Sequence, residues 1–254
     1  MTDTTAGRFT GRTIIVTGAG SGIGRATATR IANEGGRVIA TDVVPERLDA
    51  LRAELTGLPG AVETVVGDVA AADTIDALIA AAGERVDGLA NVAGIMDAFL
   101  PPSEVDDATW DRVFSVNVTG PMRLTRAVLP LMIAAGRGAV VNVASEAALR
   151  ASAAGAAYTA SKHAIAGFTK SVAFFHGPQA IRANAVAPGA VATNIEAPMR
   201  SEYAAGRVGP IMQVAIPPVA QPEQLAAAIT WLLSDDSANV NGAVLPSDGG
   251  WSVV

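Results

Sequence analysis

Short apolar runs alternate with longer amphipathic stretches along almost the whole chain, and this alternation constrains the fold more than any other feature. The apolar runs cover residues 13–17, 37–41, 62–66, 88–92, 139–144, 181–187 and 243–245. Apolar residues recur at three- and four-residue spacing over residues 23–33, 45–55, 72–82, 107–134, 156–175 and 222–233. Near-continuously apolar strands separated by helices are typical of a parallel sheet that is covered on both faces. The pattern therefore predicts a doubly wound α/β fold with roughly seven parallel strands.

No linker, repeat or low-complexity tract divides the sequence, so we expect one domain over residues 1–254. Residues 194–221 differ from the rest, because their prolines and scattered apolar residues show no clean period. A loop of this length inside a compact domain is usually functional. We interpret residues 194–221 as a mobile lid over a substrate.

The composition argues against several classes of protein. The chain has no cysteine and only two histidines, which excludes disulfides and thiolate sites and predicts no metal centre. A net charge of −6 without a Lys/Arg cluster argues against nucleic acid or an anionic membrane as a partner. The polar N-terminus and the lack of a long apolar run predict neither a signal peptide nor a membrane span, and hence a cytoplasmic protein.

A glycine-rich turn joins the first predicted strand to the first predicted helix. Its pattern from Thr17 is T-G-x-x-x-G-x-G, and the common fingerprint G-x-G-x-x-G does not fit because Ile23 occupies the third glycine position. A tight strand–helix turn is one interpretation, but glycines placed here also let the backbone approach a pyrophosphate at a helix N-terminus. We expect the turn to bind a dinucleotide. Its predicted binding residues are Gly18, Ser21, Gly22, Ile23 and Gly24.

Asp42, at the end of the second predicted strand, indicates which dinucleotide is bound. A carboxylate at this place accepts both ribose hydroxyls of NAD and repels the 2′-phosphate of NADP, although a turn or capping Asp is an alternative. Ser21 and Val43 leave two usual places for a phosphate-pairing cation empty, whereas Arg25 and Arg47 are near in sequence. These residues favour NAD over NADP.

Tyr158 and Lys162 are four residues apart on a predicted helix and therefore share one face. A nearby ammonium group stabilises tyrosinate, so we expect Lys162 to lower the pKa of Tyr158 and let it act as a base. Ser145, at the end of the fifth predicted strand, is able to hold a substrate oxygen beside the phenol. An exposed helix pair and a turn-capping serine are the alternatives for these residues taken singly.

The order of motifs over nearly the whole chain resembles the short-chain dehydrogenase/reductase family. The motifs are residues 17–24, Asp68-Val69, Asn91-Val92-Ala93-Gly94, Asn117, Ser145, Tyr158, Lys162 and Pro188-Gly189. The resemblance implies a single Rossmann-like domain and hydride transfer between NAD(H) and a small, largely apolar alcohol or ketone. The family's usual N-N-A-G carries Val92 at its second position here, which affects local hydrogen bonding rather than the reaction class.

The same resemblance implies a role for each matching residue. Tyr158 is expected to be the general base in oxidation and the acid in reduction, with Lys162 holding the nicotinamide ribose. Ser145 would orient the substrate oxygen, and Asn117 would hold a water that links Lys162 to solvent. Further cofactor contacts are expected at Asp68, Val69, Asn91, Ala93, Gly94, Pro188, Gly189, Val191 and Thr193.

Several alternatives stay open at this point. An NADPH-dependent reductase of 3-oxoacyl thioesters is disfavoured by Asp42, and a non-catalytic dinucleotide sensor or scaffold is disfavoured by the presence of a base. Glu146 either touches the substrate or is solvated. Relatives in the family are commonly tetramers, and the predicted helices over residues 107–134 and 156–175 have more apolar residues than one buried face needs. We therefore expect a homodimer or homotetramer.

Overall fold

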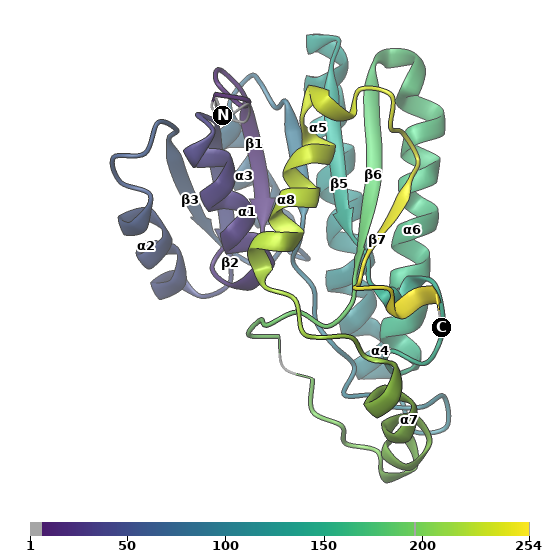
Figure 1. Cartoon of the computed structure of the whole chain (residues 1–254). Coiled ribbons are helices and arrows are strands. Elements are labelled where there is room, and N and C mark those ends of the chain that lie inside the picture. The colour runs from purple at the N-terminus through teal and green to yellow at the C-terminus, as the bar shows by residue number, and fades with distance from the viewer. Residues whose placement is uncertain (1–6, 196, 254) are drawn as a thin grey trace.

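A seven-stranded parallel sheet forms the centre of the protein, as seen in a computed structural model that describes residues 7–195 and 197–253 (Figure 1). The strands are β1 (Thr13–Thr17), β2 (Arg37–Asp42), β3 (Val62–Val66), β4 (Gly88–Asn91), β5 (Gly138–Val143), β6 (Ile181–Pro188) and β7 (Val244–Ser247). Their order in the sheet is β3-β2-β1-β4-β5-β6-β7, and every neighbouring pair is parallel. The predicted doubly wound α/β fold is confirmed, and the strand ends agree with the predicted ones to within a residue or two.

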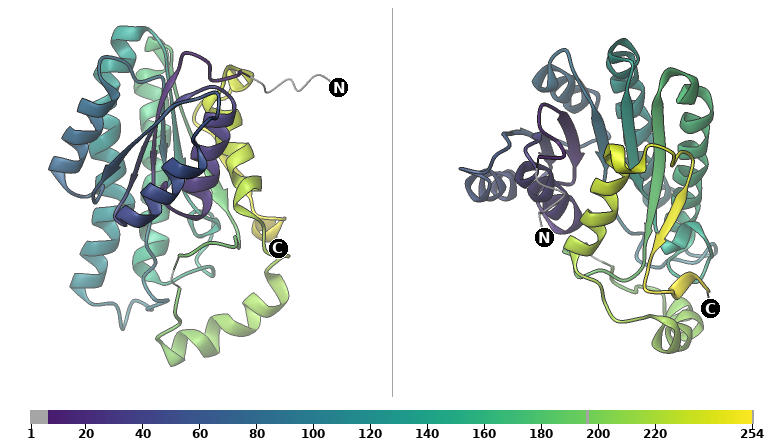
Figure 2. Two further views of the ribbon diagram at one scale, coloured as in Figure 1. Left: turned by 90° about the vertical axis from the view of Figure 1, so that its left-hand side faces the viewer. Right: turned by 45° about the horizontal axis from the view of Figure 1, so that its top comes forward.

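Helices cover both faces of the sheet (Figures 1 and 2). One layer contains α1 (Gly22–Asn33), α2 (Pro45–Glu54) and α8 (Pro222–Leu233), and the other contains α3 (Ala72–Ala82), α5 (Gly120–Ala135) and α6 (Ala156–His176). Because side chains alternate along a strand, Ile14 and Val16 pack against the first layer whereas Ile15 packs against the second. The core is thus two apolar layers separated by the sheet.

The helix predicted over residues 107–134 is interrupted in the structure. It consists of α4 (Asp107–Phe114), a π-helical turn (Ser115–Thr119) and α5. A π-helical turn inserts an extra residue into the helix without changing the local composition, so the apolar spacing did not reveal it. Such turns occur frequently at functional sites.

The interpretation of residues 194–221 as an irregular loop is wrong in part, because α7 (Glu202–Ala215) lies within them. Pro210 and two glycines inside α7 weaken its helical signal, which explains why the sequence did not predict it. Ser201 caps the helix by accepting a hydrogen bond from the Ala204 amide at 3.0 Å. A parallel bridge between Val191 and Ala220 joins the two ends of the segment. Glu196, which belongs to the predicted lid, lies outside the described residues.

Of the helices within residues 7–195 and 197–253, none is both long enough and apolar enough to cross a bilayer.

Candidate active site

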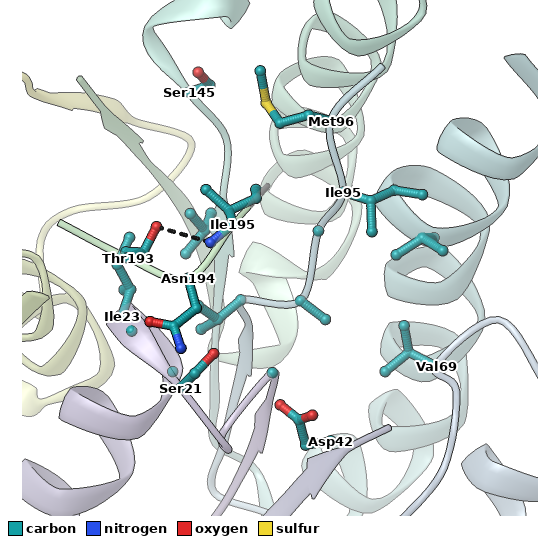
Figure 3. Close-up of a pocket in the computed structure, with 18 of the residues that line it drawn as sticks. Ser21, Ile23, Asp42, Val69, Ile95, Met96, Ser145, Thr193, Asn194 and Ile195 are labelled. Carbon is teal, nitrogen blue, oxygen red and sulfur yellow. Dashed lines mark hydrogen bonds between the residues drawn. The ribbon is translucent and has the colours of Figure 1, made fainter. Parts of the chain in front are cut away.

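A cleft of about 580 Å³ lies at the carboxyl edge of the sheet, where ligands bind in open α/β folds. Its lining residues follow the ends of β1 to β6, and it extends from Asp42 at one end to Ser145 and Met96 at the other (Figure 3). Most of the predicted site residues line it, namely Gly18, Ser21, Gly22, Ile23, Gly24, Asp42, Asp68, Val69, Ala93, Gly94, Ser145, Tyr158, Lys162, Pro188, Gly189, Val191 and Thr193.

The glycines of the turn between β1 and α1 occupy positions where a side chain would be strained or would clash. Gly18 and Gly22 have φ values of 64° and 50°, which other residues rarely adopt. A Cβ atom on Gly24 would lie 2.1 Å from the carbonyl oxygen of Gly18, and one on Gly18 would lie 3.0 Å from Cα of Ala93. The backbone at the N-terminus of α1 therefore forms an open wall of the cleft. This cradle fits the diphosphate of a dinucleotide.

Asp42 lies at the end of the cleft opposite Ser145 and is 8% exposed. Its Oδ2 accepts a hydrogen bond from the Gly20 amide at 3.0 Å, and its Oδ1 accepts one from the Val44 amide at 3.0 Å. The carboxylate thus fastens the glycine turn as well as facing the cleft, a second task that the sequence did not reveal. Arg47 also lines this end, so a cation lies near the carboxylate.

Asp68 and Val69 line the same end of the cleft and are joined there by a residue that the sequence did not single out. Arg112 of α4 forms an ion pair with Asp68, with 2.9 Å between Nη1 and Oδ2, and also lines the cleft. Asp68 and Arg112 are far apart in sequence, and no motif connects them. The ion pair joins α4 to the residues that follow β3.

Ser145, Tyr158 and Lys162 meet at the opposite end of the cleft. Tyr158 is 8% exposed and Lys162 is 3% exposed. The Tyr158 hydroxyl forms a side-chain hydrogen bond with Ser145, and Nζ of Lys162 lies 5.3 Å from the centre of the phenol ring. Lys162 also donates to the carbonyl oxygen of Val143 at 2.9 Å, which ties α6 to the end of β5. The arrangement presents a phenol, a hydroxyl and an ammonium group to one small volume.

The expectation that Lys162 lowers the pKa of Tyr158 is wrong for this structure. Burial raises the pKa of Tyr158 to about 12, while the hydrogen bond with Ser145 acts in the opposite direction and the negative charge of Asp97 adds to the rise. Burial also lowers the pKa of Lys162 to about 8. Desolvation is therefore the main cause of both pKa shifts, and at neutral pH the phenol keeps its proton.

Asn117 lies behind the cleft rather than in its wall, within the π-helical turn. Its Oδ1 accepts from the Ile95 amide at 2.9 Å, and its Nδ2 donates to the Ile95 carbonyl at 3.0 Å and to Oγ of Ser161 at 3.1 Å. A Cβ atom on Gly94 would lie 3.3 Å from Oδ1 of Asn117 and 3.4 Å from Nζ of Lys162. Asn117 and Lys162 therefore both lie next to Gly94. Through its hydrogen bonds with Ile95, Asn117 also holds the segment that lines the cleft.

Asn91, predicted to contact a cofactor, is buried away from the cleft. Its Nδ2 donates to Oδ1 of Asn142 at 2.8 Å, and Asn142 in turn donates to Oγ1 of Thr169 at 2.8 Å. The chain of amides joins β4, β5 and α6, so Asn91 supports the sheet. The backbone amide of Val92 donates to Oγ1 of Thr17 at 2.9 Å, so the unusual side chain leaves this link intact.

Glu146 is neither solvated nor in the wall of the cleft. Its side chain is fully buried and forms an ion pair with Arg150. The guanidinium group of Arg150 lies 5.5 Å from the centre of the Trp251 ring. Both interpretations offered by the sequence are therefore wrong, and Glu146 instead ties the turn after Ser145 to the C-terminal segment.

Apolar side chains surround the Ser145 end of the cleft. Ile95, Met96 and Ile195 line it, and Figure 3 shows Met96 and Ile195 on the same side as Ser145. Ile195 also donates its amide to Oγ1 of Thr193 at 3.4 Å. Within the described residues, no group of His, Asp or Glu side chains is arranged to hold a metal ion. The site can therefore bind a dinucleotide along its length and a largely apolar molecule beside the phenol.

Comparisons with known proteins agree with this geometry. A sequence profile described as short chain dehydrogenase matches residues 12–204. The chain is 41% identical to the short-chain dehydrogenase/reductase cdmF of Talaromyces verruculosus, over 95% of this chain and 97% of that protein. It is 37% identical to 3beta-hydroxysteroid dehydrogenase 2 of Eggerthella lenta, over 95% of each chain. The crystal structure of levodione reductase superposes with a TM-score of 0.87 at 36% identity, covering 97% of this chain and 99% of that one. The chain therefore belongs to the short-chain dehydrogenase/reductase family of oxidoreductases.

Proposed function

We propose that the protein transfers a hydride between NAD(H) and the carbinol or carbonyl carbon of a small, largely apolar alcohol or ketone. The observation that carries this proposal is the meeting of Ser145, Tyr158 and Lys162 at one end of a cleft whose other end carries a glycine cradle and Asp42. The relatives named above include a dehydrogenase of a hydroxysteroid and a reductase of levodione, which supports an apolar substrate.

The cradle of residues 18–24 would hold the diphosphate, and Asp42 would accept hydrogen bonds from the adenosine ribose. Asp68 and Val69 would contact adenine, with Arg112 orienting Asp68 through their ion pair. The carboxamide would be held by Pro188, Gly189, Val191 and Thr193, which line the cleft after β6. When bound, the nicotinamide would supply or accept the hydride.

The residues of the chain would handle the proton. In reduction, Tyr158 donates its hydroxyl proton to the substrate oxygen while Ser145 holds that oxygen beside it. The raised pKa of Tyr158 keeps the donor protonated at neutral pH. In oxidation, the phenolate removes the proton, so this direction requires a higher pH. Lys162 would hold the nicotinamide ribose, and Asn117 would hold a water that returns protons from solvent.

Residues 194–221 would cover the substrate as a lid, with α7 as its rigid part. The bridge between Val191 and Ala220 keeps the ends of this segment together, and Ile195 at its start lines the cleft. The lid would thus exclude water from the Tyr158 end and select the shape of the substrate.

A panel of secondary alcohols and ketones, with NADH absorbance as the readout, tests the proposed reaction. Turnover with NAD(H) on apolar members of the panel is expected. Binding of NAD without turnover of any member would instead support a dinucleotide sensor. A second candidate function is the NADPH-dependent reduction of 3-oxoacyl thioesters, and the presence of Arg47 in the cleft favours it. A preference for NADPH and for 3-oxoacyl thioesters in the assay would support this candidate.

A further inference from the structure

Helix α6, which carries Tyr158, begins without a capping side chain of its own. Its N-cap residue is Gly155, and the first-turn amides of a helix have no partners within the helix. A Cβ atom on Gly155 would lie 2.5 Å from Oδ2 of Asp97 and 2.6 Å from the amide nitrogen of Leu100. The glycine is therefore required by a loop that approaches the start of the helix from another part of the chain.

This loop, residues 97–100, supplies the missing cap. Oδ2 of Asp97 accepts from the Tyr158 amide at 2.9 Å, and Oδ1 accepts from the Gly155 amide at 3.2 Å. The carbonyl oxygen of Leu100 accepts from the Ala156 amide at 2.9 Å. Asp97 is 1% exposed, so its carboxylate is committed to these donors rather than to solvent.

The loop holds a conformation that costs free energy. Ala98 and Phe99 have φ values of 56° and 57°, which residues other than glycine adopt rarely. Strain of this kind persists where the surroundings determine it, and it gathers at active sites. The Phe99 amide donates to Oδ1 of Asp97 at 3.2 Å, so the same carboxylate that caps α6 also holds the strained residues.

We propose that Asp97 is a positioning residue for Tyr158: it caps α6 from outside the helix and thereby sets the phenol against Ser145 and Lys162. This inference rests on the proposed role of Tyr158 as general acid and base. Met96, which directly precedes this loop, lines the cleft, so adjacent residues contact the proposed substrate end and hold the start of the helix that carries Tyr158.

The charge of Asp97 has a second consequence for the phenol. The groups that face Tyr158 are Lys162 from its own helix, Ser145 from the end of β5 and Asp97 from the loop; Glu146, in the turn after Ser145, is paired with Arg150. Burial is the main cause of the raised pKa of Tyr158, and the negative charge of Asp97 adds to it. Replacing this charge by a neutral amide should therefore lower the pKa.

The pH profile of alcohol oxidation by Asp97→Asn tests this inference. Asn keeps one acceptor oxygen but loses the charge and the second acceptor. We expect kcat to fall by about 10–100-fold because the phenol is misplaced, and we expect the pH of half-maximal rate to move to lower values. A purely structural cap would lower the melting temperature and leave that pH unchanged, and this result would overturn the proposal.

Asp87→Asn is the matched control. Asp87 is 4% exposed and also accepts a backbone amide, that of Thr13 at 2.9 Å, but it lies at the amino end of β4, away from the cleft. This variant should lose stability with no change in the pH profile. A shift of the profile in Asp87→Asn equal to that in Asp97→Asn would count against a specific role for Asp97.

Two further variants separate this inference from the proposed function. If Tyr158→Phe retains turnover, the assigned acid is wrong; if it loses turnover while Asp97→Asn keeps the wild-type rate and profile, only the role of Asp97 is wrong. If Asp97→Asn does not fold, Gly155→Ala keeps the charge and displaces the carboxylate. That variant should lower kcat at unchanged NAD affinity, and an unchanged kcat would overturn the proposal.

Discussion

At the scale of single residues, Tyr158 is subject to influences that oppose one another. Burial and the charge of Asp97 favour the protonated phenol, whereas the hydrogen bond with Ser145 favours the phenolate. Because burial and the charge of Asp97 prevail, the phenol is protonated at neutral pH, which suits the proposed role of Tyr158 as a proton donor. Oxidation should therefore speed up in alkaline solution, where the phenolate forms.

Removal of the phenol oxygen is the most direct test of this residue. Tyr158→Phe keeps the ring and should lower kcat by about 10²–10⁴-fold, the usual contribution of general acid–base catalysis. NAD affinity, measured by titration of the protein, should hardly change because the cradle and Asp42 are intact. Near-normal turnover in Tyr158→Phe would show that another group moves the proton.

Lys162 combines its proposed role in cofactor binding with a cost in stability. Burial lowers its pKa from the usual 10.5 to about 8, so the folded protein binds this proton less tightly than the unfolded chain does. The free energy of unfolding should then rise between pH 8 and 10.5, by up to about 3 kcal/mol, because the unfolded chain holds the proton in that range.

Lys162→Met tests both roles. We expect lower kcat and weaker NAD binding, together with a melting temperature at pH 7 that is equal to or above that of the wild type. The rise of stability in alkaline solution should disappear. Lys170→Met, which replaces an exposed lysine of the same helix, is the control and should change none of these measurements. A large loss of stability in Lys162→Met at pH 7 would contradict the argument.

We expect Asp42 to determine the choice between NAD and NADP. We expect NAD to bind at least about tenfold more tightly than NADP, because like charges a few ångströms apart near a surface repel by a few kcal/mol. Asp42 also holds the Gly20 amide, so Asp42→Asn, which keeps an acceptor oxygen, is a better test than alanine. The variant should narrow the gap between NAD and NADP in titrations of both. Equal affinities in the wild type would contradict the assignment.

At the scale of elements, the π-helical turn and the proposed lid place side chains in the cleft or directly behind it. The π-helical turn places Asn117 against the segment that leads to Met96, and the bridge at Val191 and Ala220 fixes where the lid starts and ends. The lid touches the cleft through Ile195, which is 44% exposed, while Val214 on α7 is 87% exposed. Ile195 therefore belongs to the part of the proposed lid that lines the cleft, and Val214 belongs to the part that faces solvent.

Ile195→Ser should raise KM for an apolar substrate several-fold, since partial burial of an isoleucine side chain contributes on the order of 1 kcal/mol. NAD affinity should stay close to that of the wild type. Val214→Ser removes a similar side chain from the exposed part of the lid and should leave KM unchanged. Equal effects of the two substitutions on steady-state kinetics would indicate that the lid acts through its stability alone.

At the scale of the whole molecule, exposed aromatic residues point to self-association. Phe174 and Phe175 at the end of α6 are 76% and 68% exposed and contact each other edge to face. Large exposed apolar side chains on a long helix favour pairing with a second copy. Light scattering at micromolar concentration should report a dimer or tetramer, and a stable monomer would contradict this expectation.

Phe175→Asp should shift the population toward smaller species, because it places a charge in the proposed contact. Val214→Asp adds the same charge to the lid and should leave the mass unchanged. If both substitutions dissociate the assembly equally, the contact does not lie specifically on α6.

The sequence by itself determined the parallel sheet, its strand positions and most of the cleft wall, since these follow from local periodicity and from short motifs at the ends of strands. It did not reveal the π-helical turn or α7, because an inserted residue and an internal Pro210 leave the apolar spacing ambiguous. Only the tertiary structure showed that Asn91 supports the sheet, that Arg112 pairs with Asp68, and that Asp97 caps the helix of Tyr158. Each of these contacts joins residues that are distant in sequence, and no local pattern encodes such a pairing. The direction of the Tyr158 pKa was likewise decided by burial, which depends on how the layers pack rather than on the four-residue spacing to Lys162.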